Sequence, residues 1–260
     1  MLTLKTDATV TVLAGVYLVL LFLFATPLMA QDVVTAKSGK YQTAILELYT
    51  SEGCSSCPPA DRWFNQLVKV PENELDVLAL SFHVDYWDYI GWTDIYANPT
   101  YTNRQRHLAR VNQQSSVYTP EFFINGIEAR GTSSIIDEIT LTNKSLSTVD
   151  LKLSLQLDGD RILINLSSHF DVDQDKLLRF VVYENNLSSD VKKGENAGKK
   201  LHHQRVVRYL SPKKKLLEEI SYSIKIKPQW LLKNLGIAAL VKNKEGFYLQ
   251  TVFSPLARQN

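Results

Sequence analysis

The first half of the chain alternates short apolar runs with stretches in which apolar residues recur at helical spacing. The run AILELY (44–49) is typical of a strand, and it ends at a loop that contains two cysteines. After Pro58 and Pro59 the apolar positions follow a helical period to about Val70, and prolines suit a first helical turn, where no amide donor is needed. The run DVLALSFHV (76–84) is typical of a buried strand. The pattern therefore predicts a strand–helix–strand unit.

The same alternation continues through the next fifty residues. The polar stretch 98–114 is expected to hold a helix. The segment EFFINGIEAR (121–130) predicts two short strands joined by Asn125-Gly126, the strongest short hairpin signal. Residues 133–143 then predict a closing helix.

From about Val149 the apolar positions alternate with polar ones. Two such runs flank Asp158-Gly159 and predict a second hairpin. Further strands are predicted at 177–184, 220–226, 236–242 and 247–253. Six or seven short strands with almost no helix are typical of a β-sandwich.

These two patterns predict two domains, an α/β domain over residues 31–146 and a mostly antiparallel β-sandwich-like domain over residues 147–260. The charges divide at the same boundary. The first part carries 9 Lys/Arg against 14 Asp/Glu, and the second carries 19 against 12. Opposite net charges predict a contact between the two domains, and neither part contains a basic arm of the kind that binds nucleic acid.

The first thirty residues differ from the rest of the chain. Lys5 precedes an apolar run of about 15 residues at 10–24, and the segment ATPLMA ends at Ala30. A basic start, a short apolar core and small residues near a cleavage point predict a secretory signal peptide over residues 1–30. The alternative is an uncleaved membrane anchor, which usually needs roughly 20 apolar residues. We therefore expect an exported protein, periplasmic or extracellular, that is not attached to a membrane after cleavage.

The stretch SEGCSSCPPAD (51–61) contains Cys54 and Cys57, the only cysteines of the chain. The pattern places Cys54 at a helix N-terminus, where unpaired backbone amides and the helix macrodipole favour a thiolate. Cys57, one helical turn later, is positioned to attack a mixed disulfide. We therefore expect thiol–disulfide exchange, with Cys54 as the nucleophile and Cys57 as the resolving thiol. In an oxidising compartment the pair can also persist as a disulfide.

Other interpretations of the cysteine pair remain open. A structural zinc site needs about two further nitrogen or sulfur ligands, and the five histidines do not follow a zinc-finger spacing. Cys54, Cys57 and His83 are suitable ligands for copper(I), because soft thiolates select that ion. An inert disulfide is the remaining alternative, although closing so small a loop stabilises a fold little. The redox interpretation requires no cofactor, whereas the metal interpretation requires copper(I).

Charged residues near the cysteines are candidates for proton transfer or metal binding. His83 and Asp85 lie in HVDYWDYIGW (83–92) at a predicted strand end, where open α/β sheets bind ligands. Such groups are rarely buried without partners, and a histidine can shuttle protons or bind a metal. Glu47, a charged residue inside the first apolar strand, is a third candidate. An edge-exposed or partnered structural acid is the alternative interpretation of Glu47.

Several longer motifs carry a resemblance to a known family. They are ELYTSEGCSSCPPAD, LSFHVDYWDYIGWTD, NRQRHLA, VYTPEFFING and GENAGKKLHHQRVVR. Together they resemble the secreted, thioredoxin-like family catalogued as domain of unknown function 1223. The resemblance covers nearly all of the mature chain and implies a thioredoxin-like domain followed by a β-rich domain. It supplies no reaction, because the substrates of that family are not established.

The thioredoxin-like resemblance also assigns roles to individual residues. It implies that the Thr119-Pro120 peptide bond is cis and that both residues line a substrate groove beside the cysteine pair. Thioredoxins keep a buried carboxylate under their cysteines, but the matching position here is Leu48. Glu47 is therefore one residue out of register and is expected to point to the other face of the sheet. Ser-Ser replaces Gly-Pro between the thiols, so no reduction potential is carried over.

The loop GENAGKKLHHQRVVR (194–208) contains His202 and His203. A solvent-exposed loop is the default interpretation, and contact with the acidic half or with its substrate is the alternative. Taken together, the sequence predicts an exported thiol–disulfide oxidoreductase-like protein whose partners are protein or small-molecule disulfides and thiols. The alternatives are a copper(I)-binding protein or metallochaperone, and a non-catalytic interaction module.

Overall fold

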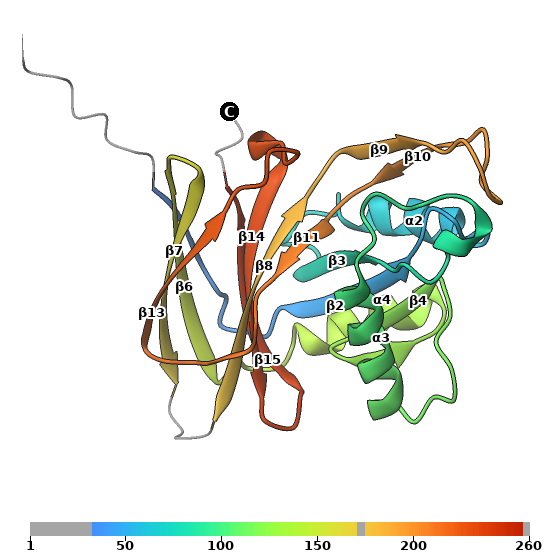
Figure 1. Ribbon diagram of the computed structural model, residues 1–260. Helices are drawn as coiled ribbons and strands as arrows, with labels where there is room; N and C mark the ends of the chain where they lie inside the picture. Colours follow the sequence, from blue (N-terminus) through green and yellow to red (C-terminus); the bar gives the residue numbers. More distant parts are fainter. Residues whose placement is uncertain (1–32, 171–174, 257–260) are drawn as a thin grey trace, which may run out of the picture. The chain divides into compact units, whose positions relative to one another are not determined.

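The computed structural model describes residues 33–170 and 175–256 (Figure 1). The signal peptide predicted over residues 1–30 lies outside these ranges. From Val33 onward the chain forms one compact unit. Within the described ranges, no helix is long and apolar enough to cross a membrane.

A nine-stranded mixed sheet runs through both halves of the chain. Its order is β15 (Tyr248–Pro255), β14 (Leu235–Asn243), β8 (Lys176–Glu184), β11 (Val206–Leu210), β3 (Val77–His83), β2 (Ala44–Thr50), β4 (Glu121–Ile124) and β5 (Ile127–Ala129), with β12 (Lys214–Lys215) paired to β8. Strand β3 pairs in parallel with both of its neighbours, β2 and β11. All other pairings in this sheet are antiparallel.

Two smaller sheets complete the strands of the described residues. The antiparallel four-stranded sheet has the order β1 (Val34–Lys37), β6 (Val149–Asp158), β7 (Arg161–Phe170) and β13 (Glu219–Lys225). It packs on β8 and β14 through a shared apolar core. Strands β9 (Leu187–Asp190) and β10 (Lys200–His203) form a separate hairpin beside helix α2 (Cys57–Leu67), as Figure 1 shows.

The predicted fold class, a thioredoxin-like α/β domain followed by a β-sandwich-like domain, is wrong. The described chain is mostly β, and its largest sheet contains strands from both predicted domains. The physical reason is β11. Val206 of this strand pairs with Glu184 of β8 on one side and with Ser81 of β3 on the other. A sheet edge that would otherwise expose unpaired amides and carbonyls is thereby closed by strands from the second half. A thioredoxin fold is therefore not shown.

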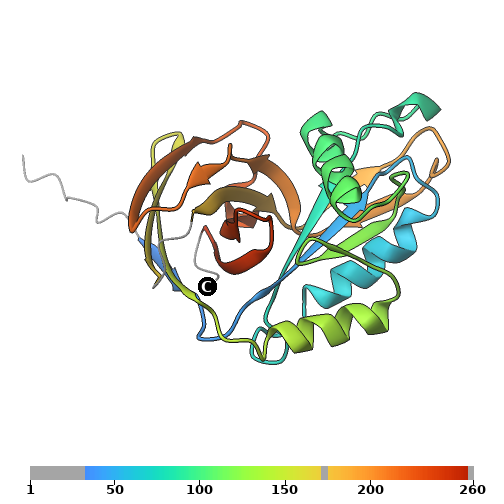
Figure 2. The same cartoon turned by 90° about the horizontal axis from the view of Figure 1, so that it is seen from below.

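Helices cover both faces of the sheet around β2 (Figure 2). Successive side chains of a strand point to opposite faces. Leu46 and Leu48 accordingly pack with α2 and with α4 (Thr132–Thr142). Ile45 and Tyr49 pack on the other face with α3 (Pro99–Val111). Each fully buried aliphatic side chain stabilises the fold by about 1.5–3 kcal/mol, so β2 is held from both sides.

The local elements predicted in the first half are confirmed. The predicted strands 44–49 and 76–84 correspond to β2 and β3, and the predicted hairpin turn has positive φ angles of 50° at Asn125 and 91° at Gly126. Helix α2 ends at Leu67, a few residues earlier than predicted. Pro71 follows four residues after Leu67, and it disfavours a helical conformation at Val70, the residue before it.

Candidate functional site

Cys54 and Cys57 lie at the junction between β2 and α2, as the sequence predicted. They form a disulfide with a Cα–Cα distance of 5.4 Å, and both residues are completely buried. Cys57 opens the helix, and Pro58 and Pro59 occupy its first turn, where their missing amide donors are not needed. The backbone amide of Cys57 donates to the carbonyl of Cys54 at 3.2 Å, which closes the loop around the pair.

The Thr119-Pro120 peptide bond is cis, as the resemblance implied. The Thr119 carbonyl oxygen lies 3.7 Å from Cys54 Sγ and accepts a hydrogen bond from Ser56 Oγ at 3.4 Å. Trp87 Nε1 donates to Thr119 Oγ1 at 2.7 Å and fixes this residue. The structure therefore brings Thr119 against the cysteine pair. Its role in a substrate groove stays a prediction.

The loop between β9 and β10 covers the cysteine pair from the second half of the chain. Asn196 is fully buried, and its Nδ2 donates to the carbonyl of Glu52 at 2.8 Å and to that of Cys54 at 2.9 Å. The Glu195 carboxylate accepts from the Ser55 amide at 3.1 Å. We call residues 191–199 the cap. Because the cap binds the backbone on both sides of Cys54, the disulfide is closed off from solvent in this conformation.

A buried cluster of acids and histidines lies directly behind the cysteine loop. Glu52 accepts from Trp92 Nε1 at 2.8 Å, and its other carboxylate oxygen is 3.2 Å from His203 Nε2. Asp94 is 2.6 Å from His83 Nδ1 and also accepts from the Glu52 amide at 2.9 Å. The two imidazole rings meet edge to face at 4.8 Å. Nε2 of His83 is buried without a hydrogen-bond partner among the described residues.

The electrostatics of this cluster favour a charged His83–Asp94 pair. Burial lowers the pKa of His83, but the Asp94 carboxylate more than offsets this, so the net pKa lies above the usual 6.5. Burial likewise raises the pKa of Asp94, and the contact with His83 brings it below its usual value. Asp61 lies four residues after Cys57, on the same face of α2. Burial raises the pKa of Asp61, although His203 and His83 partly oppose this.

Glu47 belongs to a different cluster, on the α3 face of β2. Its two carboxylate oxygens accept from Arg104 Nη2 at 2.6 Å and from Arg104 Nε at 2.8 Å. The hydroxyls of Tyr49 and Tyr248 donate to it at 2.8 Å and 2.7 Å. Burial raises the pKa of Glu47, but Arg104 overcomes this and lowers it to about 2. The out-of-register position of Glu47 therefore gives it a partner that keeps it charged, away from the cysteines.

Asp85 also lies outside the buried cluster. Its carboxylate accepts from Thr102 Oγ1 at 2.5 Å, and its backbone amide donates to the same oxygen at 3.2 Å. These bonds join the loop after β3 to the first turn of α3. Of the three candidates for proton transfer, the structure thus places only His83 in the cluster behind the cysteines.

Sequence reasoning missed most members of the site. Glu52 and Asp61 flank the cysteines in the chain, yet nothing in a single acid signals that it will be buried. Asn196 comes from a loop 142 residues after Cys54. For His203, the default of a solvent-exposed loop is wrong, because the residue is only 3% exposed. The one available signal was the pair of histidines beside a glycine-marked loop.

The three side chains expected to bind copper(I), those of Cys54, Cys57 and His83, make other contacts in the structure. In residues 33–170 and 175–256, no group of three or more His, Cys, Asp and Glu side chains is placed to hold a metal ion. The two cysteine sulfurs are joined to each other, and Nδ1 of His83 is bonded to Asp94.

Comparisons with known proteins give a family and two similar folds. A family model described as protein of unknown function (DUF1223) matches residues 45–242. The chain is similar to the crystal structure of protein AGR_C_4864 from Agrobacterium tumefaciens, with 23% identity and a TM-score of 0.61, over 86% of this chain and 98% of that one. It is also similar to HBP35 of Porphyromonas gingivalis, with 16% identity and a TM-score of 0.66, over 86% of this chain and 80% of that one. At these identities the likeness concerns the fold alone. No curated protein matches the chain.

Proposed function

The chain belongs to the DUF1223 family, and we propose that it is an exported protein that exchanges electrons with dithiols and disulfides through Cys54 and Cys57. The observation that carries this proposal is the position of the pair. The disulfide lies at the N-terminus of α2, and buried groups that can bind or release protons lie directly behind it. A purely structural disulfide needs no such neighbours.

The exchange proceeds in two balanced steps. A substrate thiolate attacks the Cys54 sulfur, the Cys54–Cys57 bond breaks, and Cys57 leaves as a thiolate that takes up a proton. The second thiol of the substrate, as its thiolate, then attacks the mixed disulfide and releases Cys54. The substrate is thereby oxidised to a disulfide, and the protein pair is reduced to two thiols. In the reverse direction Cys54 attacks a substrate disulfide and Cys57 resolves the intermediate.

The cluster behind the cysteines supplies a route for the proton of Cys57. Asp61 lies one helical turn from Cys57, and burial favours its protonated form. His83 and His203 lie close enough to influence Asp61 electrostatically. We assign Asp61 a proton-transfer role, in which it holds the proton that Cys57 accepts or releases.

Export is part of the proposal and is motivated by the signal-like residues 1–30. A disulfide that uses both cysteines of the chain suits an oxidising compartment such as the periplasm or the extracellular space. Fractionation of cells that produce the full chain, with mass determination of the mature N-terminus, tests this part. We expect cleavage after Ala30, whereas an intact N-terminus in the cytoplasm contradicts export.

Equilibration with glutathione redox buffers tests the redox function itself. We expect a reduction potential in the range of about −120 to −270 mV that is typical of exchange proteins, rather than below about −300 mV, as for structural disulfides. A Cys57→Ser variant should trap a mixed disulfide with glutathione on Cys54, and a Cys54→Ser variant should not. A potential below the structural limit, together with no trapped adduct, overturns the proposal.

Two further measurements separate the redox role from its alternatives. The Asp61→Asn variant should change the pH profile of exchange more than its rate at the optimum pH, because it removes a proton site and leaves both thiols.

Titration of the reduced protein with copper(I) should give no stoichiometric complex that depends on Cys54, Cys57 and His83. A tight complex of this kind would favour a metallochaperone instead.

A further inference from the structure

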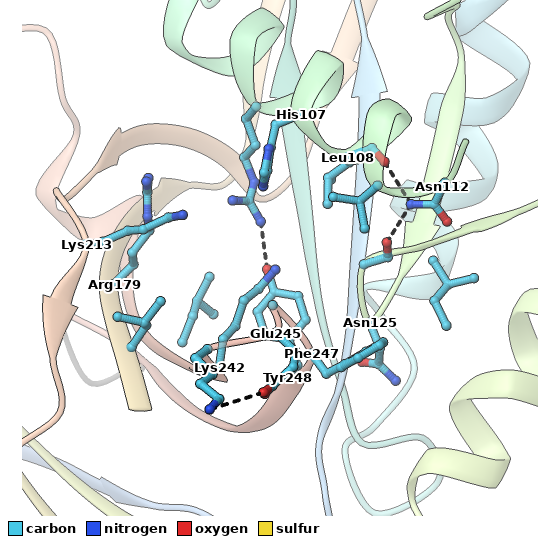
Figure 3. Close-up of a pocket in the computed structure, with 18 residues that line it drawn as sticks. His107, Leu108, Asn112, Asn125, Arg179, Lys213, Lys242, Glu245, Phe247 and Tyr248 are labelled. Carbon is cyan, nitrogen blue, oxygen red and sulfur yellow. Dashed lines mark hydrogen bonds and ion pairs between the residues drawn. The ribbon is translucent and has the colours of Figure 1, made fainter. Parts of the chain in front are cut away.

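A cavity of about 360 Å³ lies at the surface between the C-terminal part of α3 and the β14–β15 hairpin. It is lined by residues of several elements, among them Leu108 of α3, Arg179 of β8 and Lys242 of β14. Figure 3 shows Arg179 and Lys213 on one side of this space and Asn112 and Asn125 on the other. The volume falls within the range of small-molecule sites. None of the residues assigned to the cysteine site lines the cavity.

Positive charge in this cavity is poorly neutralised. Among the described residues, Arg179, Lys213 and Lys242 form no ion pair, and Nε of Arg179 is buried without a hydrogen-bond partner. The one carboxylate in the described lining, Glu245, lies 3.9 Å from the ammonium group of Lys244. The lining of the cavity therefore contains more cationic than anionic side chains.

The electrostatics of the lining are consistent with this excess. Burial lowers the pKa of Lys242 to about 7, and repulsion by Arg104, Lys213 and Arg179 contributes to the same shift, although the Glu47 carboxylate partly opposes it. Burial also lowers the pKa of Arg179, with repulsion by Arg104 in the same direction. The neighbouring cations thus disfavour the charged form of Lys242 in a partly desolvated space. An anion placed among them would remove this repulsion and would gain charge-assisted hydrogen bonds.

The lining also contains apolar side chains, and several of them face outward. Val111 is 59% exposed, Ile127 is 55% exposed and Phe247 is 56% exposed. These three come from α3, from β5 and from the turn before β15, and they lie around one cavity together with Leu108 and Leu240. Exposed apolar side chains that gather at a cavity mark a surface that contacts an apolar group.

We propose that this cavity binds an amphipathic organic anion, whose carboxylate or phosphate head group contacts Arg179, Lys213 and Lys242 and whose apolar body lies on Val111, Ile127 and Phe247. The guanidinium of Arg179 is suited to bidentate contact with either head group. The apolar wall selects against inorganic phosphate, and the cations select against neutral molecules of the same length. This site is independent of the disulfide and of any redox role.

Isothermal titration calorimetry of the full chain with four probes tests the proposal. Decanoate and decyl phosphate carry the two head groups, decanol lacks charge, and inorganic phosphate lacks the apolar body. We expect at least one of the two amphipathic anions to bind with one-to-one stoichiometry. Decanol and inorganic phosphate should bind at least about tenfold more weakly, which corresponds to 1.4 kcal/mol. The stronger of the two anions identifies the head group, and binding should weaken with added salt because the charges are screened.

Matched variants locate the binding. Lys242→Met and Arg179→Gln should each raise the dissociation constant of the stronger amphipathic anion about tenfold, and Phe247→Ser should also weaken the binding of that anion. The exposed Lys233→Met and the double variant Cys54→Ser/Cys57→Ser should leave binding unchanged. Thermal melting confirms that each variant is folded, and protection of Lys242 from acetylation by the bound probe, read by mass spectrometry, gives a measurement on the wild-type chain. Equal affinity for decanol, unchanged affinity in both cation variants, or no protection of Lys242 overturns the proposal.

Discussion

Two buried carboxylates, those of Glu47 and Glu52, lie five residues apart around the end of β2, and their hydrogen-bond partners differ. The Glu47 carboxylate accepts hydrogen bonds from Nε and Nη2 of Arg104 and from two tyrosine hydroxyls. Glu52 is held by the indole of Trp92 and by His203, beside the His83–Asp94 pair. One cluster is built on an arginine, whose charge does not change at ordinary pH. The other contains His83, whose pKa lies above 6.5 because Asp94 overcomes the cost of burial.

The difference separates a structural cluster from one that can take part in chemistry. Every oxygen of the Glu47 carboxylate has a donor, and Arg104 holds its pKa at about 2. A group of this kind neither gives nor takes protons at neutral pH. In the second cluster His83 keeps one buried nitrogen without a partner, and the cysteine loop is part of the same neighbourhood. Of these two carboxylates, only Glu52 therefore lies in a cluster that is expected to take part in proton transfer.

The largest expected effect comes from breaking the Glu47–Arg104 pair. The Arg104→Met variant leaves a fully buried carboxylate without its counter-charge. We expect the free energy of unfolding, measured by urea denaturation at pH 7, to fall by about 3–5 kcal/mol. The loss should shrink as pH is lowered toward 4.5, because Glu47 in the variant can then take up a proton.

An exposed ion pair provides the control for this comparison. Arg130 contacts Glu128 at 2.8 Å, but its side chain is 74% exposed. The Arg130→Met variant should show no measurable loss of stability, because water screens such a pair. Similar losses in the two variants would mean that burial does not set the strength of the Glu47 cluster.

An intermediate effect is expected from a substitution in the cap, residues 191–199, which covers the disulfide. Asn196→Ala removes two hydrogen bonds, to the backbone carbonyls of Glu52 and Cys54. At about 1 kcal/mol net for each bond, opening of the cap should become easier by about 2 kcal/mol. The rate at which dithiothreitol reduces the disulfide should rise by roughly 30-fold, while the global unfolding midpoint changes less.

Asn186→Ala is the matched control for the cap variant. Its exposed side chain accepts a hydrogen bond from Gln204 near the other end of the β9–β10 hairpin. Reduction of the disulfide should be unaffected in this variant. An unchanged reduction rate in Asn196→Ala would mean that reagents reach the cysteines by a route that the cap does not close.

The comparison also shows how far the sequence could predict the fold. Local apolar patterns placed β2, β3 and α2, the Asn-Gly turn signal placed the hairpin of β4 and β5, and α3 was expected in a polar stretch. It did not place β11, which has only five residues and whose pairing partners lie far away in the chain. One unpredicted strand was enough to join two predicted domains through a single sheet. The predicted fold class is wrong for this reason, whereas the local elements predicted in the first half are confirmed.

The candidate site was predictable to a similar extent. The cysteines and the cis peptide bond before Pro120 follow from local motifs and from a family resemblance. The opposite face assigned to Glu47 follows from the two-residue period of a strand. The partners of Glu52 and of Cys54 come from residues more than 140 positions away, His203 and Asn196. No local pattern specifies such contacts, so the buried cluster had to be seen in the structure.

The smallest expected effect concerns the titration that distinguishes the second cluster from the first. His83 has a pKa raised above 6.5 in the folded protein, chiefly because Asp94 overcomes the cost of burial, with Asp61 and Glu52 acting in the same direction. Protonation of His83 therefore stabilises the fold below pH 6.5, and this contribution is lost as pH rises through the raised pKa. The Asp94→Asn variant should be less stable than wild type by about 1–2 kcal/mol near pH 6, with a smaller difference near pH 9. Urea denaturation across this range measures it. If the difference in unfolding free energy between wild type and Asp94→Asn stays constant with pH, the His83–Asp94 pair is a neutral hydrogen bond. In that case the histidine cluster would not differ from the arginine cluster in its capacity for proton transfer.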